Sequence, residues 1–330
     1  MPSTPLPNPF AGHFSINTRS ILLAGLFPLL LAGCEAPLDL TGVEQEQGKS
    51  IRRTDQLQAL AANDRVQVAV GNDGLVLTRS EEPRAIGREA WQRQTLPGAP
   101  GLIDVEACAD NSLIALSFDK QLWRSDDDGA SWQAFAIPTQ ENLLDLTCAP
   151  DGRYWAVGSF STLISSDDQG RNWSEDSLNE DAMLTSIQFI DDSLAYASGE
   201  FGLVARSTDG GASWEVLPPM LDEFYPQSTL FIDAASGWSV GLDGTVLHTA
   251  DGGESWQLSP TPVAAPLYGL LDTADGLYVL GENATLLKHE GTQWTPVPVP
   301  ARPVYLRAAL ATAEGLLVAG GNGTLLSLKR

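Results

Sequence analysis

Short runs of alternating apolar and polar residues, separated by turn residues, follow one another from about residue 57 to the end of the chain. One stretch reads LLDLTCA, then the turn PDG, then RYWAVG and TLISS, then the turn DDQGRN, and last WSED. Alternation with β-branched and aromatic residues is typical of strands, and Asp, Asn, Pro and Gly between such runs are typical of turns. The pattern therefore predicts four short antiparallel strands in each unit.

Two phrases recur along the chain with a common period. Tryptophan returns at intervals of 41, 41, 41, 42 and 38 residues between Trp91 and Trp294. A glycine phrase such as VGNDGLVL or VGLDGTVL recurs with the same period, and its seven copies begin at Val70, Leu116, Val157, Ser198, Val240, Leu280 and Ala319. A fixed period of about 40 residues with internal turns is typical of propellers and solenoids, and four-stranded antiparallel units are propeller blades. We predict an all-β chain in which residues 57–330 form a seven-bladed β-propeller of four-stranded antiparallel blades.

The seventh unit ends at LLSLKR and has no tryptophan strand. Its outer edge would therefore stay unpaired unless the other end of the chain supplied a strand. Residues 38–54 are the spare segment before the first unit, and we expect part of that segment to close the ring.

A third phrase, Ser/Thr-x-Asp-x-Gly-x-x-Trp, precedes the fourth predicted strand of four units. Its copies are Ser125, Asp127, Gly129, Trp132; Ser166, Asp168, Gly170, Trp173; Ser207, Asp209, Gly211, Trp214; and Thr249, Asp251, Gly253, Trp256. Short polar side chains bond the backbone of tight turns, glycine permits positive φ, and tryptophan buries a large apolar area. Four equivalent catalytic sites would serve no purpose, so we interpret the phrase as a structural fastener.

The N-terminus has the features of an export signal. Arg19 precedes an apolar run of 11 residues at 21–31, too short to span a bilayer, and the run ends in LAGC at Cys34. This sequence resembles the bacterial lipobox. We expect a lipoprotein signal peptide over residues 1–33 and, over residues 34–56, a lipidated Cys34 with a tether to the membrane. Glu35 in place of Asp favours the periplasmic side of the outer membrane over the inner membrane.

Charge limits the choice of partner. Nineteen Lys and Arg stand against 42 Asp and Glu, and the net charge is −23, so we expect no nucleic-acid partner, because phosphate binding needs a basic surface. His248 and His289 occupy equivalent places one unit apart, too distant to share a metal, and we expect neither a metal site nor a cofactor.

The tryptophan phrase is the Asp-box, or bacterial neuraminidase repeat, which occurs in sialidases and in non-enzymatic propellers. Coupled to the glycine phrase at this period, it resembles the photosystem II stability/assembly factor family. The resemblance covers about residues 57–330 and implies a secreted or lumenal seven-bladed propeller that assists assembly and is not an enzyme. Photosynthetic members hold their client with an arginine-rich surface, and this chain has no matching arginine run. We therefore do not expect a photosystem as the client.

One face of the predicted ring carries aromatic residues in its loops and polar residues where the inner strands begin. We expect the candidate binding face to consist of Gln58, Asp145, Phe160, Ser186, Phe201, Tyr225, Ser228, Tyr268, Tyr305 and Arg307, with Val105 at the corresponding place in the second unit. Solvation of a water-filled channel is the alternative role for its polar members.

Cys108 and Cys148 lie 40 residues apart, one repeat, at the ends of two consecutive inner strands. Export to an oxidising compartment favours a disulfide between them. Two free, packed cysteines are the alternative, because the corresponding residues of the other units are apolar.

These observations lead to a monomeric, non-enzymatic lipoprotein that binds a protein client of the cell envelope, as scaffold or assembly factor. A glycan-active or glycan-binding propeller is the alternative. Three arginines in one cleft, or a pair of carboxylates about 5–10 Å apart, would favour that alternative.

Overall fold

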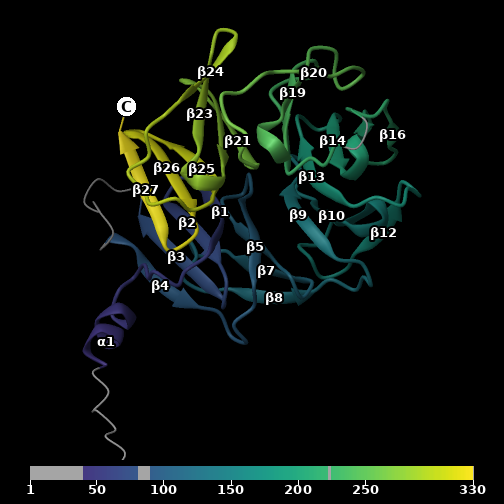
Figure 1. Cartoon of the computed structure of the whole chain (residues 1–330). Helices are drawn as coiled ribbons and strands as arrows, with labels where there is room; N and C mark the ends of the chain where they lie inside the picture. The colour runs from purple at the N-terminus through teal and green to yellow at the C-terminus, as the bar shows by residue number, and fades with distance from the viewer. Residues whose placement is uncertain (1–39, 81–89, 222–223, 330) are drawn as a thin grey trace, which may run out of the picture. The chain divides into compact units, whose positions relative to one another are not determined.

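The computed structural model describes residues 40–80, 90–221 and 224–329. Residues 43–330 form one compact unit, in which seven antiparallel sheets follow one another along the chain (Figure 1). Six of the sheets have four strands and the seventh has three, in the described part of the chain. The prediction of a seven-bladed β-propeller with four-stranded blades is confirmed.

The strands of each sheet are consecutive in sequence. The first three sheets consist of β1 (Leu57–Ala62), β2 (Val66–Gly71), β3 (Leu75–Ser80) and β4 (Gln92–Thr95); β5 (Leu102–Ala107), β6 (Leu113–Ser117), β7 (Gln121–Ser125) and β8 (Gln133–Ala136); and β9 (Leu143–Cys148), β10 (Tyr154–Gly158), β11 (Thr162–Ser166) and β12 (Ser174–Ser177). The next two consist of β13 (Leu184–Phe189), β14 (Ala195–Gly199), β15 (Leu203–Ser207) and β16 (Glu215–Val216); and β17 (Ser228–Phe231), β18 (Gly237–Val240), β19 (Val246–Thr249) and β20 (Gln257–Leu258). The last two consist of β21 (Leu267–Thr273), β22 (Gly276–Gly281), β23 (Leu286–Glu290) and β24 (Gln293–Pro296); and β25 (Leu306–Thr312), β26 (Gly315–Gly320) and β27 (Thr324–Lys329).

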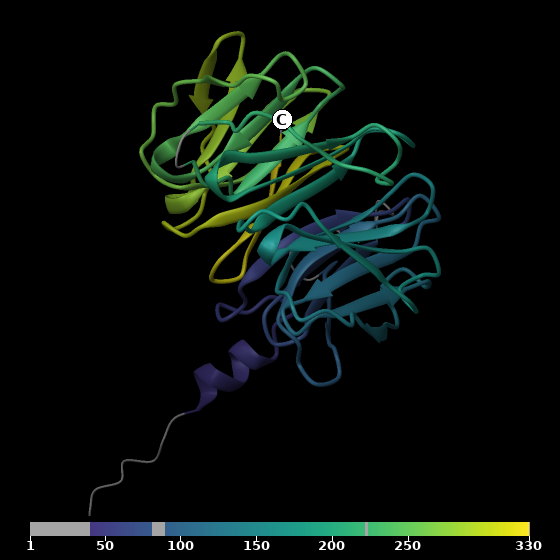
Figure 2. The same ribbon diagram turned by 90° about the vertical axis from the view of Figure 1, so that its right-hand side faces the viewer.

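The first strands of the seven sheets form the inside of the ring. Each lies beside the first strand of the next sheet, and β25 returns to lie beside β1 (Figures 1 and 2). The core is divided among the spaces between neighbouring sheets. For example, Val68 and Val76 of the first sheet pack with Leu113 and Ala115 of the second, and all four are fully buried. Stability is therefore spread over neighbouring pairs of blades, as in other repeat proteins.

The four Asp-box turns have one hydrogen-bond pattern. In the fifth blade the Thr249 hydroxyl accepts the N–H of Gly253 at 3.0 Å and donates to Asp251 at 2.8 Å, and the second oxygen of Asp251 accepts the hydroxyl of Ser255 at 2.6 Å. Gly253 has φ +91°, which a side chain would strain. These contacts give the backbone N–H groups of the turn hydrogen-bond partners within the turn itself. They also direct Trp256 into the core, where it is 8% exposed.

The ring closes without the expected strand. Residues 40–56 contain the short helix α1 (Thr41–Gln47) and an irregular segment, and no strand, while residues 38 and 39 lie outside the described part. Asp55, which is 2% exposed, makes one of the contacts between the two ends of the ring. Its carbonyl accepts the N–H of Gly323 at 2.7 Å, and its carboxylate pairs with Arg93 at 2.8 Å. The backbone bond to Gly323 and the bond from the Tyr305 hydroxyl to Gln56 thus join the ends, while Arg93 holds Asp55 within the first blade.

The predicted signal peptide, Cys34 and the first part of the predicted tether lie outside the described residues. Among the residues that the structure does describe, no helix is both long and apolar enough for a membrane span.

Candidate functional site: the mouth of the channel

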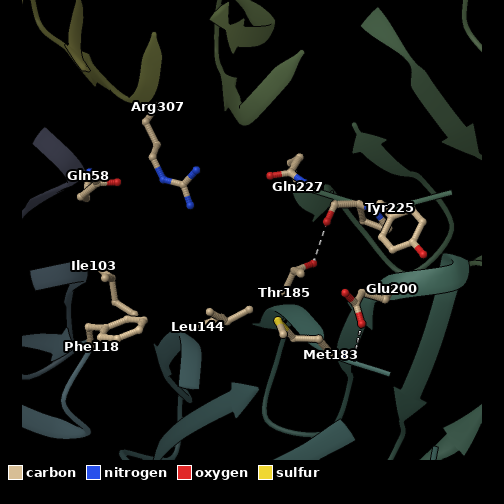
Figure 3. Close-up of a pocket in the computed structure, with 11 residues that line it drawn as sticks. Gln58, Ile103, Phe118, Leu144, Met183, Thr185, Glu200, Tyr225, Gln227 and Arg307 are labelled. Carbon is tan, nitrogen blue, oxygen red and sulfur yellow. Dashed lines mark hydrogen bonds between the residues drawn. The ribbon is translucent and has the colours of Figure 1, made fainter. Parts of the chain in front are cut away.

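A β-bulge interrupts the first strand of six of the seven sheets, close to where each strand begins. The extra residue at each bulge is Gln58, Ile103, Leu144, Thr185, Tyr268 or Arg307, and Gln227 lies just before β17 in the remaining sheet. Bulges commonly re-aim a side chain at the rim of a barrel. All of these residues except Tyr268 line one cavity of about 340 Å³ (Figure 3). We refer to this cavity as the mouth.

Loops of the same face complete the lining with Phe118, Met183, Glu200, Tyr225 and Pro226. The Thr185 hydroxyl donates to the Pro226 carbonyl at 3.0 Å, and a Glu200 carboxylate oxygen accepts the Met183 N–H at 3.0 Å. These bonds hold the loops in place. The lining has two charged side chains. Glu200 is held by its bond to the Met183 N–H, and Arg307 extends into the mouth (Figure 3).

Exposed aromatic residues lie on the face of the ring that carries the mouth. Phe118, Phe160 and Phe201 are 65%, 59% and 50% exposed, and each lies in the turn between the second and third strands of its sheet. Phe160 and Phe201 have φ of 53° and 59°, in the left-handed region that bulky residues seldom adopt. The Phe201 ring meets the ring of Tyr225 edge to face, with centroids 5.3 Å apart. Three consecutive blades thus expose an aromatic side chain on one face of the ring.

The structure divides the ten residues of the predicted binding face into groups. Gln58, Tyr225 and Arg307 line the mouth, and Phe160 and Phe201 lie in the turns around it. Tyr268 donates to Glu282 at 3.1 Å, and Tyr305 donates to Gln56 at 2.9 Å, so both hydroxyls are engaged. Asp145, Ser186 and Ser228 are not in the lining.

The alignment of the inner strands therefore needs a correction of one residue. Asp145, Ser186 and Ser228 pair with the first residue of the Gly phrase, and the residues in that position in the second and seventh blades are Asp104 and Ala308. Counting from the Gly phrase without the bulges therefore mixed two rings: Gln58, Tyr268 and Arg307 are bulge residues, whereas Asp145, Ser186 and Ser228 lie one position further along their strands and Val105 two positions further.

Side chains of the inner strands tie the second blade to the third, the third to the fourth and the fourth to the fifth. Asp104 accepts the N–H of Leu146 at 3.0 Å, Asp145 that of Ile187 at 2.7 Å, and Ser186 that of Thr229 at 3.2 Å. Two residues further along, Glu106 accepts the N–H of Cys148 at 3.1 Å and Gln188 that of Phe231 at 2.8 Å. We call these five contacts the inter-blade ties. Sequence reasoning missed them, although polar residues spaced 41 apart were a visible signal.

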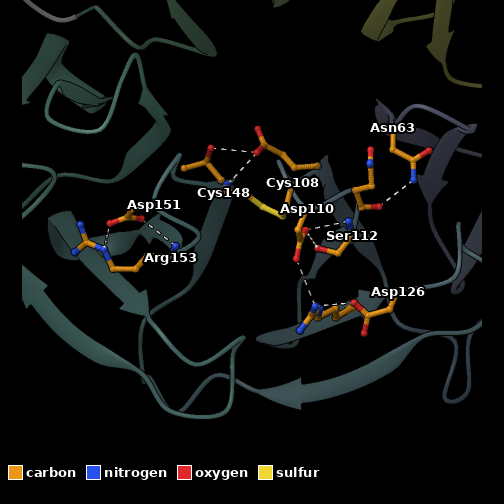
Figure 4. Close-up of a disulfide and its surroundings, with 12 residues drawn as sticks. Asn63, Cys108, Asp110, Ser112, Asp126, Cys148, Asp151 and Arg153 are labelled. Carbon is orange, nitrogen blue, oxygen red and sulfur yellow. Dashed lines mark hydrogen bonds and ion pairs between the residues drawn. A yellow bond between two sulfur atoms is a disulfide. The ribbon is translucent and has the colours of Figure 1, made fainter.

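The ties of the second and third blades place three carboxyl groups close together. Burial raises the pKa of Asp104 and, with the nearby charge of Asp104, raises the pKa of Asp145 well above its usual range. Burial and then the charge of Asp104 raise the pKa of Glu106 to about 8. Beside them a disulfide joins Cys108 and Cys148, whose Cα atoms are 5.5 Å apart (Figure 4). In the described part of the chain, no cluster of three or more His, Cys, Asp or Glu is arranged to hold a metal.

Replacing Glu106 by Gln should make the protein more stable at pH 8, by roughly 4 kcal/mol, while changing its stability much less at pH 5. A carboxyl group whose pKa is higher in the folded state than in the unfolded state binds its proton more tightly when the protein is folded. Its contribution to the free energy of unfolding is therefore lost as the pH rises from about 4.5 toward 8. Gln188 shows that an amide can make the tie, since it both accepts from and donates to Phe231. Urea unfolding of both proteins at several pH values measures the difference. A constant difference from pH 5 to pH 8 would contradict the raised pKa.

The chain is similar to known propellers both in sequence and in fold. Residues 136–208 and 173–269 match the family model described as photosynthesis system II assembly factor YCF48. The resemblance to that family is confirmed. The matched residues run from the end of the outer strand of the second blade to the first strand of the sixth and include three of the four Asp-boxes. No curated protein sequence matches the chain.

Solved structures show the same fold at low sequence identity. A structure described as YCF48 bound to D1 peptide is 20% identical with a TM-score of 0.59, and the match covers 72% of this chain and 78% of that one. YCF48 from Cyanidioschyzon merolae is 16% identical with a TM-score of 0.54, over 72% and 96%. A catalytically inactive virginiamycin B lyase from Staphylococcus aureus with quinupristin is 11% identical with a TM-score of 0.70, over 83% and 94%.

Proposed function

We propose that this protein is a lipid-anchored, non-enzymatic scaffold or assembly factor on the periplasmic side of the outer membrane, and that its mouth binds an extended segment of a protein client. The observation that carries the proposal is the mouth itself, a cavity of about 340 Å³ that is lined in part by Phe118, with exposed Phe160 and Phe201 in the corresponding turns of the next two blades. The lipobox at Cys34 supports the anchor and the compartment.

The chemistry of the mouth suits a peptide. Exposed apolar side chains gathered on one face mark interaction surfaces, and aromatic residues dominate binding energy when a partner desolvates them. A cavity of this size accommodates one or two side chains, since ligand pockets begin at about 300 Å³. The ion pairs of the described residues do not include Arg307, so its guanidinium can receive an acidic or carbonyl group from the client.

A structural relative supports the choice of a peptide over a glycan. A propeller of the same fold has been solved with a D1 peptide bound. A sialidase-like site would need three arginines, and a two-carboxylate glycosidase would need a pair of acids in one cleft. The described lining of the mouth contains one arginine and one glutamate, so the glycan alternative gains no support from this cavity.

Site-specific crosslinking in cells tests the proposal. A photo-reactive amino acid in place of Phe201 should give a defined client adduct, and Arg307→Ala should reduce its yield several-fold. The matched control places the same photo-reactive amino acid at Ile232. This residue is 42% exposed and lies in the turn between the first and second strands of its blade, on the face of the ring opposite the mouth. Cys34→Ser should move the adduct out of the membrane fraction, which separates anchoring from docking. An adduct of equal yield at Ile232, or none at Phe201, would refute client binding at the mouth.

A further inference from the structure

The last strand of the chain has one open edge. β27 pairs with β26 along its whole length and without a register shift. In the other six sheets a fourth strand lies on the opposite side of the third, whereas none of the described residues forms a strand there in the seventh (Figure 1). An edge without proline or a bulge can accept another strand.

The backbone of β27 indicates which groups face that edge. In three other blades the residue equivalent to Leu325 accepts a hydrogen bond from the segment of the fourth strand. These bonds run from Leu217 to Val204 at 2.9 Å, from Ser259 to Val246 at 2.8 Å and from Val297 to Leu286 at 2.8 Å. The direction of backbone groups alternates along a strand, so the N–H and C=O of both Leu325 and Ser327 face outward.

The side chains identify what the edge lacks. Leu326 occupies the position held in other blades by Leu77, Leu247 and Leu287, which are 0%, 0% and 1% exposed. Each of those leucines shares a core cluster with the tryptophan that begins the fourth strand, namely Trp91, Trp256 or Trp294. Leu326 is only half-buried, as is Leu328 beside it. The site therefore has the shape and polarity to accept a strand that carries an aromatic residue.

The described residues offer no such strand to spare, because each of their other strands belongs to a blade. Outside the described residues its aromatic side chains are Phe10, Phe14 and Phe27, all upstream of Cys34. The segment from Cys34 to residue 39 has no aromatic residue and contains Pro37, which cannot donate a hydrogen bond. A second copy offers no better source, because its tryptophan strands are paired within its own blades.

We propose that the outer edge of β27 is a second docking site, which binds an extended, aromatic-bearing segment of a partner protein as the fourth strand of the seventh blade. Backbone hydrogen bonds to Leu325 and Ser327 hold the segment, and its aromatic side chain covers Leu326. Such strand addition is an established mode of peptide recognition, in which the main chain gives affinity and side-chain pockets give specificity. The site lies on the outside of the ring and does not depend on the mouth.

The probe is a synthetic peptide with one of the chain's own fourth-strand sequences, GESWQLSP from residues 253–260. We expect it to bind the full chain in detergent, measured by fluorescence anisotropy, and we expect alanine in place of its tryptophan to weaken binding at least tenfold. Ser327→Pro removes one outward N–H at an exposed side chain and should also weaken binding at least tenfold, whereas Ser327→Ala should not. Arg307→Ala should leave binding unchanged, which separates this site from the mouth.

Several results would overturn the proposal. They are failure of the peptide to bind the full chain, equal binding of the alanine peptide, and binding that survives Ser327→Pro. A peptide with N-methylated amides on the edge-facing side keeps the test valid even if Ser327→Pro does not fold, because equal affinity of that peptide would exclude strand addition. A dimer by light scattering that Ser327→Pro dissociates would assign the edge to a second copy and refute the partner.

Discussion

Trp256→Ala should lower the free energy of unfolding by about 3–5 kcal/mol, the usual cost of emptying a large aromatic site in a core. Trp256 is 8% exposed and shares a cluster with Leu247 and Phe231, whose ring meets the indole edge to face with centroids 5.9 Å apart. Replacement by alanine leaves a cavity in the space between the fourth and fifth blades. Urea unfolding followed by far-ultraviolet circular dichroism measures the loss.

Trp256→Phe is the matched control. The indole N–H of Trp256 is buried and meets no acceptor among the described residues, whereas that of Trp173 donates to the Gly170 carbonyl at 3.0 Å. Phenylalanine therefore keeps much of the packing and removes an unsatisfied donor, so we expect it to retain most of the stability. A loss below 1 kcal/mol for Trp256→Ala would show that the Asp-box turn does not act by placing the tryptophan in the core.

Removing the disulfide by the double substitution Cys108→Ala and Cys148→Ala should cost about 2–4 kcal/mol, because the bridge closes a loop of about 40 residues in the unfolded chain. It links β5 to β9 at the same place as the tie from Glu106 to Cys148. The loss should match that produced by a reducing agent in the unsubstituted protein, and the agent should have no effect on the variant. Two titratable thiols in the denatured, unreduced protein, beyond any from Cys34, would show that the bridge does not form.

The repeat phrases were sufficient to predict the blades. The Gly phrase predicted where second strands end, and the Asp-box predicted the turn before the fourth strand, because each depends on local backbone geometry that the residue type reports directly. Gly158 is an example: a Cβ at that position would collide with the backbone of Asn142.

The mouth and the ring closure could be predicted only in part. A bulge adds one residue without a distinctive residue type, so the offset between Asp145 and Leu144 cannot be read from the sequence, and a shift of one residue turns a side chain to the other face. Part of residues 38–54 was expected to close the ring, but residues 41–47 within that segment, TGVEQEQ, form a helix, in keeping with the helical preference of Glu and Gln. The inter-blade ties depend on which inner strands lie beside each other, which is a tertiary property.

The inter-blade ties also bear on how such a ring could be inherited and rearranged. Each tie joins a side chain of one blade to the backbone of the following blade, as in the bond from Asp145 to the N–H of Ile187. The receiving blade contributes an amide that every residue except proline possesses, so its own sequence is free to drift. A duplicated or transplanted blade therefore needs to bring only its own polar side chain at the inner strand to join the next one. Because only one of the two blades must supply a particular side chain, the blades can diverge in sequence. In this chain Asp, Ser, Glu and Gln all make ties.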